Sequence, residues 1–193
     1  MKNDYKIRPE TSADYNEVEN LTREAFWNVY RPGCLEHYVL HRYRTRPDFI
    51  PELSVCLTVD GKIIAHVMYS HAEIHADDGR IVPIMTFGPI SVYPDFQRQG
   101  YGTILLKYSM KKAKELGARA LAITGNIDFY GKSGFVVAST KGIHYYAEPR
   151  NEAVPYFLIK ELANGFLDGI TGTYTDPDGY DCEGVDIDAF DTQ

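Results

Sequence analysis

The sequence contains few cysteines and no long run of apolar residues. Its three cysteines, Cys34, Cys56 and Cys182, are far apart and form no C-x-x-C pair, which argues against a disulfide framework and a zinc knuckle. No segment reaches the roughly eighteen apolar residues of a membrane span, and the N-terminal residues lack the apolar run of a signal peptide. We therefore expect a soluble, cytoplasmic protein with reduced thiols and no membrane partner.

Basic side chains are missing from the C-terminal end. The chain of 193 residues has 20 basic and 27 acidic groups and a net charge of −7. Residues 1–162 are nearly neutral, which argues against the basic face of a nucleic-acid-binding protein. We predict one domain over residues 1–162 and an acidic tail over 163–193. The tail is expected to be solvated, packed on the domain or partly disordered, and it could draw cationic amines toward a site. The tail carries eight carboxylates: Asp168, Asp176, Asp178, Asp181, Glu183, Asp186, Asp188 and Asp191.

The first half of the chain has the patterns of two helices and three strands. After the strand "YKIRP", Thr11 with Asp14 three residues later marks the start of a helix, and residues 35–44 predict a second one. Three antiparallel strands follow, because Asp60-Gly61 and a second Gly-containing turn at 77–79 separate β-rich runs.

A strand–helix–strand unit comes next. Residues 102–116 have helical spacing and end before Gly117, and "ARALAIT" follows as a strand. Such a unit normally places its two strands parallel. Further strands are expected at "FVVAS", "IHYYA" and "PYFLIKEL", and the last is a candidate sheet edge through which a homodimer could form.

The stretch "YPDFQRQGYG" joins a predicted strand to a predicted helix. Unpaired N–H groups at a helix N-terminus attract anions, and glycine lets a phosphate approach the main chain. A P-loop is excluded because the glycines are followed by Thr103-Ile104, and a dinucleotide fingerprint is excluded because position 105 is leucine. The stretch predicts a phosphorylated ligand of another class.

Two segments resemble one known family. Gln97-x-x-Gly100-x-Gly102 behind "GPISVYP" is similar to the acyl-CoA pyrophosphate loop of the GNAT superfamily of N-acyltransferases, and "GNIDFYGKSGF" resembles a second segment of that family. The resemblance covers residues 4 to about 162. It implies an α/β (α+β) fold, with a mixed, mostly antiparallel central sheet flanked by helices and a parallel pair splayed around the acyl-CoA site.

The resemblance also implies a reaction and a set of binding residues. Acetyl-CoA would donate its acetyl group directly to a primary amine of a small molecule. The main chain of Ile90 and Val92 would bind the pantetheine arm, Asn126 would steady it, and Tyr130 would protonate the departing thiolate. The pyrophosphate would be bound by the loop residues Gln97, Arg98, Gln99, Gly100, Tyr101, Gly102 and Thr103.

The acceptor side is less defined by the sequence. Tyr30 and Arg31 lie between the first two helices, where relatives cover the acceptor, and could meet a substrate carboxylate. Many relatives have a glutamate base on the central strands, but the comparable side chain here is Ser91. Glu73, His144 or a water chain could serve instead, so the base stays unassigned.

The histidines and cysteines of the chain bear on alternative interpretations. His37 and His41 have the i, i+4 spacing of a metal site but no evident third ligand, so no metal is expected. No cysteine lies in the two motif segments, which disfavours a covalent acyl-enzyme. The alternatives are a non-catalytic acyl-CoA-binding or sensing module on the same fold, or a protein N-acetyltransferase.

Overall fold

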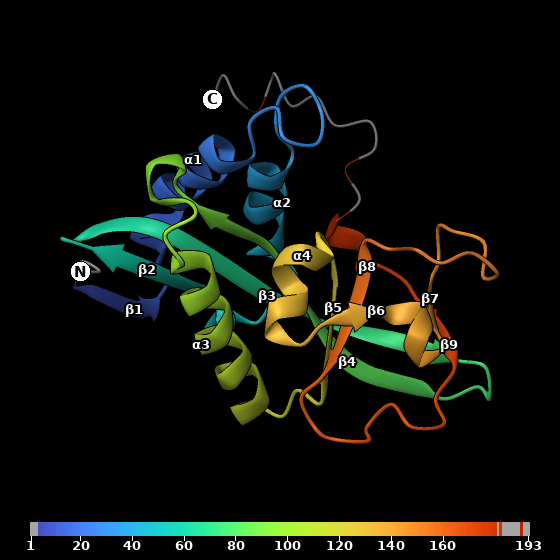
Figure 1. The fold of residues 1–193 in the computed structure, drawn as a ribbon. Helices are drawn as coiled ribbons and strands as arrows, with labels where there is room; N and C mark the ends of the chain where they lie inside the picture. Colours follow the sequence, from blue (N-terminus) through green and yellow to red (C-terminus); the bar gives the residue numbers. More distant parts are fainter. Residues whose placement is uncertain (1–3, 181, 183–189, 191–193) are drawn as a thin grey trace. The chain divides into compact units, whose positions relative to one another are not determined.

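The computed structural model describes residues 4–180, 182 and 190. Figure 1 shows its elements. They are β1 (Tyr5–Pro9), α1 (Tyr15–Phe26), α2 (Glu36–Tyr43), β2 (Val55–Val59), β3 (Lys62–Ala76), β4 (Ile81–Val92), α3 (Tyr101–Glu115), β5 (Ala120–Thr124), α4 (Ile127–Tyr130), β6 (Val136–Val137), β7 (Ile143–Tyr145), β8 (Phe157–Glu161) and β9 (Gly172–Tyr174). The helices predicted over 35–44 and 102–116 are confirmed as α2 and α3. The capping box of Thr11 and Asp14 is also confirmed, at the short 3-10 helix that precedes α1.

The chain divides into two compact units, which are described one at a time. The first unit takes its described residues from 1–69, 88–109 and 178–193, and the second from 70–87 and 110–177. Strands β3 and β4 and helix α3 therefore contribute one end to each unit.

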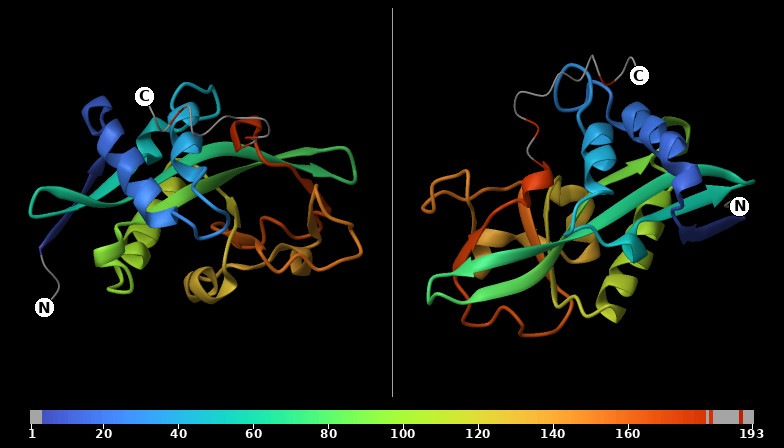
Figure 2. Two further views of the ribbon diagram at one scale, coloured as in Figure 1. Left: turned by 90° about the horizontal axis from the view of Figure 1, so that it is seen from above. Right: turned by 180° about the vertical axis from the view of Figure 1, so that it is seen from behind.

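The first unit is built on an antiparallel arrangement of β1, β2 and the N-terminal half of β3. Leu57 of β2 is the partner of Ile7 on one side and of Ala65 on the other. The hairpin between β2 and β3 turns at Asp60-Gly61, as predicted. Figure 2 shows α1 and α2 on one face of these strands and the start of α3 on the other. A hydrogen bond joins α3 to β3, because the hydroxyls of Ser109 and Tyr69 are 2.8 Å apart.

The core of the first unit lies between the two helices and the strands. Apolar residues at helical spacing on α1 and α2 face the sheet, and two polar residues of these helices, Thr22 and His37, are buried as well. The cluster consists of Val18, Leu21, Val39, Leu40, Tyr43, Cys56, Ile63 and Met68.

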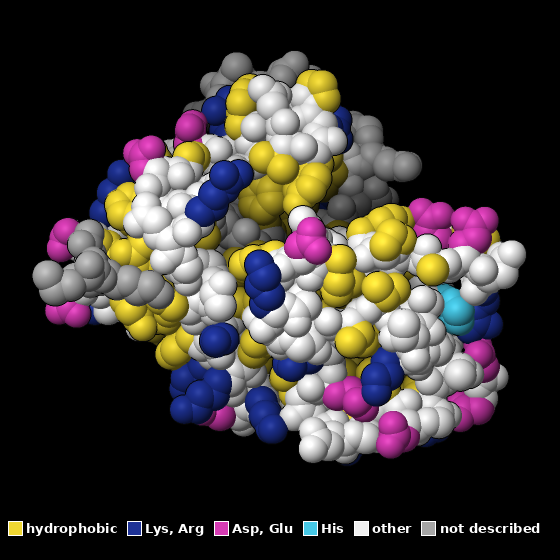
Figure 3. Space-filling view, in the orientation of Figure 1, with side chains coloured by type: hydrophobic (Ala, Val, Ile, Leu, Met, Phe, Trp, Pro, Cys, Tyr) yellow, Lys and Arg dark blue, Asp and Glu magenta, His cyan; other side chains and the backbone are white. Residues whose placement is uncertain are grey.

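Helix α3 has the amphipathic pattern that the sequence predicts. Leu106 and Met110 are buried, whereas Lys107, Lys111 and Lys114 are exposed. Figure 3 shows lysine and arginine side chains gathered over this helix. No helix in the described part of the chain combines the length and the apolar character needed to cross a membrane.

The second unit contains the parallel pair. Met85 and Thr86 of β4 pair in parallel with Leu121 and Ala122 of β5, as the strand–helix–strand unit predicts. Strand β8 then pairs antiparallel with β5 on one side and with β6 on the other. The prediction that "PYFLIKEL" forms a sheet edge is therefore wrong, because β8 has hydrogen-bonded strands on both sides.

Strand β9 comes from the segment that composition set apart as the acidic tail. It pairs antiparallel with the end of β3, where Ile74 is the partner of Tyr174, and parallel with β7. Tyr174 is 1% exposed and belongs to the core of the second unit, together with Ile74, Ile84, Ala122, Ile143, Phe157 and Ile159. Five of the tail's carboxylates, Asp181, Glu183, Asp186, Asp188 and Asp191, lie outside the described residues.

A buried ion network fixes α2 to the start of the first unit. The guanidinium of Arg44 pairs with Glu10 at 2.7 Å and also with Glu19, and the side chains of Arg44 and Glu10 are only 4% and 2% exposed. Ser54 donates a hydrogen bond to Glu10 at 2.7 Å. Burial by itself raises the pKa of Glu10, but His66 and Arg44 outweigh it and lower this pKa to about 2.

Replacing Glu10 by glutamine should flatten the acid dependence of stability. A carboxylate with a lowered pKa stabilises the folded state fully above its unfolded pKa of 4.5, and this contribution is lost as the pH falls toward 2. The shift corresponds to about 3 kcal/mol. We expect urea unfolding to show a gap of that order between wild type and Glu10→Gln at pH 7 that narrows between pH 4.5 and the lowest accessible pH.

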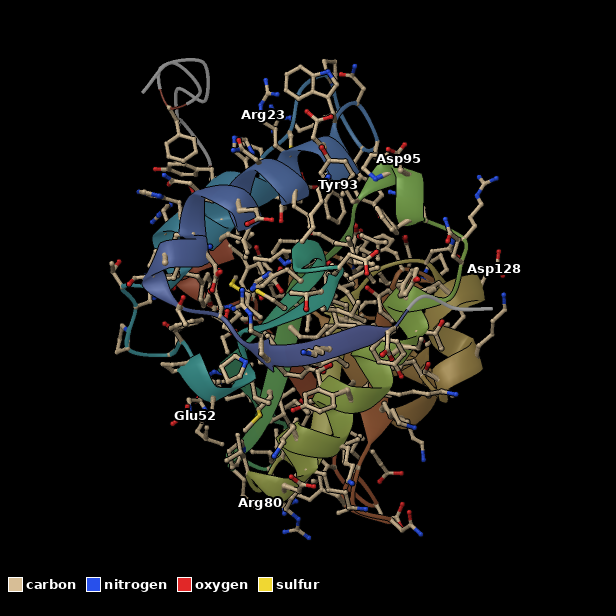
Figure 4. All side chains as sticks on the ribbon, turned by 90° about the vertical axis from the view of Figure 1, so that its left-hand side faces the viewer. Arg23, Glu52, Arg80, Tyr93, Asp95 and Asp128 are labelled. Atoms are coloured by element: carbon tan, nitrogen blue, oxygen red, sulfur yellow. The ribbon has the colours of Figure 1, made fainter. Side chains whose placement is uncertain are left out.

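The exposed Glu52, labelled in Figure 4, provides the matched control. The Glu52→Gln variant should follow the wild-type curve at every pH. A gap between wild type and Glu10→Gln that stays constant with pH would contradict the role assigned to Glu10.

Candidate active site

The loop after β4 is held by its own glutamines. The Gln97 amide donates a hydrogen bond to the carbonyl of Val92 at 3.0 Å, and the Gln99 amide donates one to the carbonyl of Asp95 at 2.8 Å. Both side chains thus reach back to main-chain groups that precede them in the chain. These two hydrogen bonds stabilise the shape of the turn.

The main chain of this loop passes twice through the left-handed region. Arg98 has φ +58° and Gly100 has φ +88°. Glycine adopts this conformation freely, whereas an arginine there costs on the order of 1 kcal/mol. Arg98 is exposed and lies three residues before the first residue of α3, so its guanidinium and the N-terminus of α3 belong to the same turn.

Helix α3 begins directly after this turn. Its first helical hydrogen bond runs from the Ile104 N–H to the Gly100 carbonyl at 3.1 Å. The N–H groups of Tyr101, Gly102 and Thr103 precede that bond and have no acceptor within the helix, so they can bind an anion. The ring of Tyr101 is 2% exposed and packs against Phe96, so Tyr101 can contribute only its main chain.

The end of β4 has two different faces. Ser91 is buried, and its hydroxyl is 2.8 Å from that of Thr22 on α1. Ile90 and Val92 are partly exposed and alternate with it along the strand. Because the Ser91 hydroxyl is engaged with α1, it does not supply the missing base.

The residues predicted for the acceptor lie between α1 and α2, also in the first unit. Tyr30 is 71% exposed, and its ring is 6.0 Å from that of Phe26. Arg31 is exposed as well. Partial desolvation by neighbouring residues, and then the charge of Glu36, raise the pKa of Tyr30 even though most of the side chain is exposed.

Asn126 and Tyr130 lie in the second unit, on the short helix α4. Asn126 caps this helix, because its side-chain oxygen accepts a hydrogen bond from the Asp128 N–H at 2.8 Å. The side chain is exposed, so its amide nitrogen can still donate a hydrogen bond to a ligand. The cap ties the position of Asn126 to that of α4 and so to Tyr130, the last residue of the helix.

The ring of Tyr130 is enclosed by aromatic residues. It packs edge to face with Phe87, Phe129 and Phe135 at centroid distances of 4.9 to 5.8 Å, and the residue is 7% exposed. Below the ring lies Gly125, where a Cβ atom would come within 2.4 Å of the Tyr130 Cε2 atom. Gly125 thus allows the ring to lie directly on the main chain.

Two thiols, one carboxylate and one imidazole remain as candidates for a nucleophile or a base. Burial raises the pKa of the thiols of Cys34 and Cys56 to about 12, so neither is a thiolate at neutral pH. Glu73 is exposed and pairs with His75 at 2.8 Å. His144 is partly buried on β7. None of these contacts identifies a base.

The two histidines of α2 differ in their surroundings. His37 is 3% exposed, and the Nδ1 atom of His41 is 3.2 Å from Glu19. Within the described ranges, no group of three or more histidine, cysteine, aspartate or glutamate side chains could hold a metal ion.

Sequence reasoning missed two features of the second unit. Nothing in the sequence distinguishes Gly125 from an ordinary turn glycine, because its constraint is the ring of Tyr130. Asp176 belongs to the predicted tail, for which packing on the domain was one alternative, and the sequence did not predict that it is partly buried and accepts a hydrogen bond from the Tyr145 hydroxyl. The one available signal in the sequence was the run "TGTY" two residues before Asp176, which predicts a strand beside this carboxylate.

Comparison with known proteins identifies a family. The model of the acetyltransferase (GNAT) family matches residues 16–135. The chain is also 24% identical over 86 residues to the uncharacterized N-acetyltransferase YjhQ of Escherichia coli. That match covers 44% of this chain and 46% of YjhQ, so the aligned region spans about half of the relative's length.

Two solved structures have a closely similar fold. The GNAT family N-acetyltransferase YhbS from Escherichia coli, in complex with CoA, has a TM-score of 0.81 at 21% identity, and the match covers 96% of each chain. A GNAT family acetyltransferase from Brucella melitensis, in complex with acetyl-CoA, has a TM-score of 0.73 at 22% identity, over 93% of this chain and all of the other. At these identities the likeness concerns the fold.

The contact between Gly125 and Tyr130 predicts a large effect for a small substitution. Gly125→Ala should lower the free energy of unfolding by about 1–3 kcal/mol, because the new methyl group must displace a packed ring. Gly131→Ala is the control, since its Cβ would meet Ile127 at an ordinary 3.4 Å. Equal stability of the two variants in urea titrations would show that the ring is not held on Gly125.

Proposed function

The chain belongs to the acetyltransferase (GNAT) family, and from this premise we propose that it transfers an acetyl group from acetyl-CoA directly to a primary amine of a small molecule. The observation that carries the proposal is the turn before α3, where left-handed Arg98 and Gly100 lead into a helix N-terminus. Relatives of the same fold that were solved with CoA or acetyl-CoA support this choice of donor.

The donor would be bound mainly by main-chain groups. The N–H groups of Tyr101, Gly102 and Thr103 would hydrogen-bond the pyrophosphate at the positive end of the α3 dipole, and the Arg98 guanidinium would add a charge-assisted contact. Ile90 and Val92 lie beyond the point where β4 pairs with β5. Their main chain would therefore bind the amides of the pantetheine arm as if the arm were an added strand.

The transfer would need two identified groups of the chain, a hydrogen-bond donor for the oxyanion and an acid for the thiolate. A neutral amine attacks the thioester carbon, and a main-chain N–H near Val92 stabilises the oxyanion. The carbon–sulfur bond then breaks while Tyr130 donates its hydroxyl proton to the sulfur, and the amine proton leaves through water or an unassigned base. The high thiol pKa values of Cys34 and Cys56 favour this direct route over a covalent acyl-enzyme.

Asn126 would have two roles. Its oxygen caps α4 and fixes the helix that carries Tyr130. Its amide nitrogen would donate a hydrogen bond to a carbonyl of the pantetheine arm. A single side chain would thus couple the position of the donor to the position of the acid.

Calorimetric titration with acetyl-CoA is the direct test of the donor site. We expect micromolar binding to the wild type, and a loss of at least tenfold in Gly102→Val, because a branched side chain would keep the pyrophosphate from the main chain. Lys111→Val places the same side chain on the exposed face of α3 and should bind normally. Failure of the folded wild type to bind acetyl-CoA would refute the proposal.

Steady-state kinetics on an acceptor amine would test the acid. Tyr130→Phe removes the hydroxyl but keeps the ring in its aromatic surroundings, so kcat should fall about a hundredfold with little change in the KM for acetyl-CoA. Tyr5→Phe, at a tyrosine that is 40% exposed, is the control. An unchanged kcat in Tyr130→Phe would remove Tyr130 from the mechanism.

A further inference from the structure

A cluster of tyrosines and carboxylates lies on the second unit. It consists of Tyr145, Glu148, Tyr156, Tyr174 and Asp176. The Tyr145 hydroxyl donates a hydrogen bond to Asp176, and the Tyr156 hydroxyl donates one to Glu148 at 2.5 Å. The ring of Tyr145 is 6.2 Å from that of Tyr156 and 6.3 Å from that of Tyr174. Figure 3 shows acidic side chains beside hydrophobic ones over the loop between β7 and β8.

The charge of Asp176 is not balanced within the described chain. Its side chain is partly buried. This burial raises the pKa of Asp176, and contacts with Tyr145 and Tyr174 offset only part of the rise. Among the residues that the structure describes, neither Asp176 nor Glu148 forms an ion pair with a lysine or arginine. Two cations of the same unit have other partners, since Lys141 pairs with Glu161 and Arg150 pairs with Asp77.

These features together favour a positively charged ligand. A partly buried carboxylate is costly unless a cation neutralises it. The faces of tyrosine rings attract ammonium and guanidinium groups, most strongly where water is excluded. The carboxylates of Asp176 and Glu148 offer the first kind of contact, and the ring of Tyr156, a residue that is 42% exposed, offers the second. The rings of Tyr145 and Tyr174 support the cluster from inside, because they pack on each other and on Phe157.

The cluster adjoins the residue proposed as the acid. The Gly125 N–H donates a hydrogen bond to the Tyr156 carbonyl at 2.7 Å. Gly125 also lies directly under the ring of Tyr130. A short series of contacts within one unit therefore leads from Tyr130 through Gly125 and Tyr156 to the cluster.

We propose that the cluster binds a positively charged group of the acceptor, and that this group is separate from the amine that is acetylated. A carboxylate partner stabilises the charged form of an amine and raises its pKa, so an amine held by Asp176 would keep its proton and could not attack a thioester. The acceptor is then a molecule with two cationic groups, such as a diamine. The inference rests on the proposed acetyl transfer.

Binding to the CoA-saturated protein tests the inference without turnover. Calorimetry would compare 1,4-diaminobutane with n-butylamine and 1,8-diaminooctane with n-octylamine at about 0.15 M salt, where long-range attraction is screened. We expect at least one diamine to bind about tenfold more tightly than the monoamine of the same length, as a charge-assisted contact implies. Asp176→Asn should abolish this preference and leave CoA binding unchanged.

Asp168→Asn is the matched control, because it removes the same charge at an exposed position of the same unit. It should keep the diamine preference. If Asp176→Asn does not fold, Tyr156→Leu replaces it, and loss of one ring face should weaken the preference about threefold.

The outcomes separate the two proposals. If CoA binds but each diamine binds no better than its monoamine, or if Asp176→Asn keeps the preference, the cation site is refuted and the acetyltransferase proposal stands. If CoA does not bind to the folded wild type, the proposed function is refuted and the inference falls with it.

Discussion

The parallel pairing of β4 with β5 ends at Thr86, and the proposed binding of the pantetheine arm along the end of β4 depends on this. Beyond Thr86 the described part of β5 continues along β8, while β4 runs on to Val92. Main-chain polar groups of a buried strand need partners. The Tyr180 hydroxyl donates a hydrogen bond to the Gly88 carbonyl at 3.1 Å, and the Gln97 amide donates one to the Val92 carbonyl. Under our proposal the amides of the pantetheine arm are the next partners.

Carboxylates are buried in both units, but their surroundings differ. Glu10 is neutralised by Arg44 and accepts a further hydrogen bond from Ser54, so it forms part of the structure of the first unit. Asp176 has phenol hydroxyls around it and no cation among the described residues. A complete network stabilises a fold, whereas an unbalanced charge in a partly open position is available to a ligand.

Most of the elements follow from local rules in the sequence. The turn at Asp60-Gly61, the capping box of Thr11 and Asp14, and the amphipathic spacing of α3 each act over a few residues, and all are present in the structure. The strand–helix–strand order also predicted the parallel pair of β4 and β5. The predicted roles of the site residues stay predictions, because they concern a ligand rather than the fold.

By itself, the sequence determined the family, the order of the elements and the glycine turn before α3, since spacing, turns and glycine preferences act between near neighbours. The tertiary structure decided what surrounds each residue. It placed β8 between two strands instead of at an edge, laid the Tyr130 ring on Gly125, and brought Asp176 against Tyr145. Strand neighbours, ring contacts and burial depend on residues that are distant in the chain, and periodicity carries no information about them.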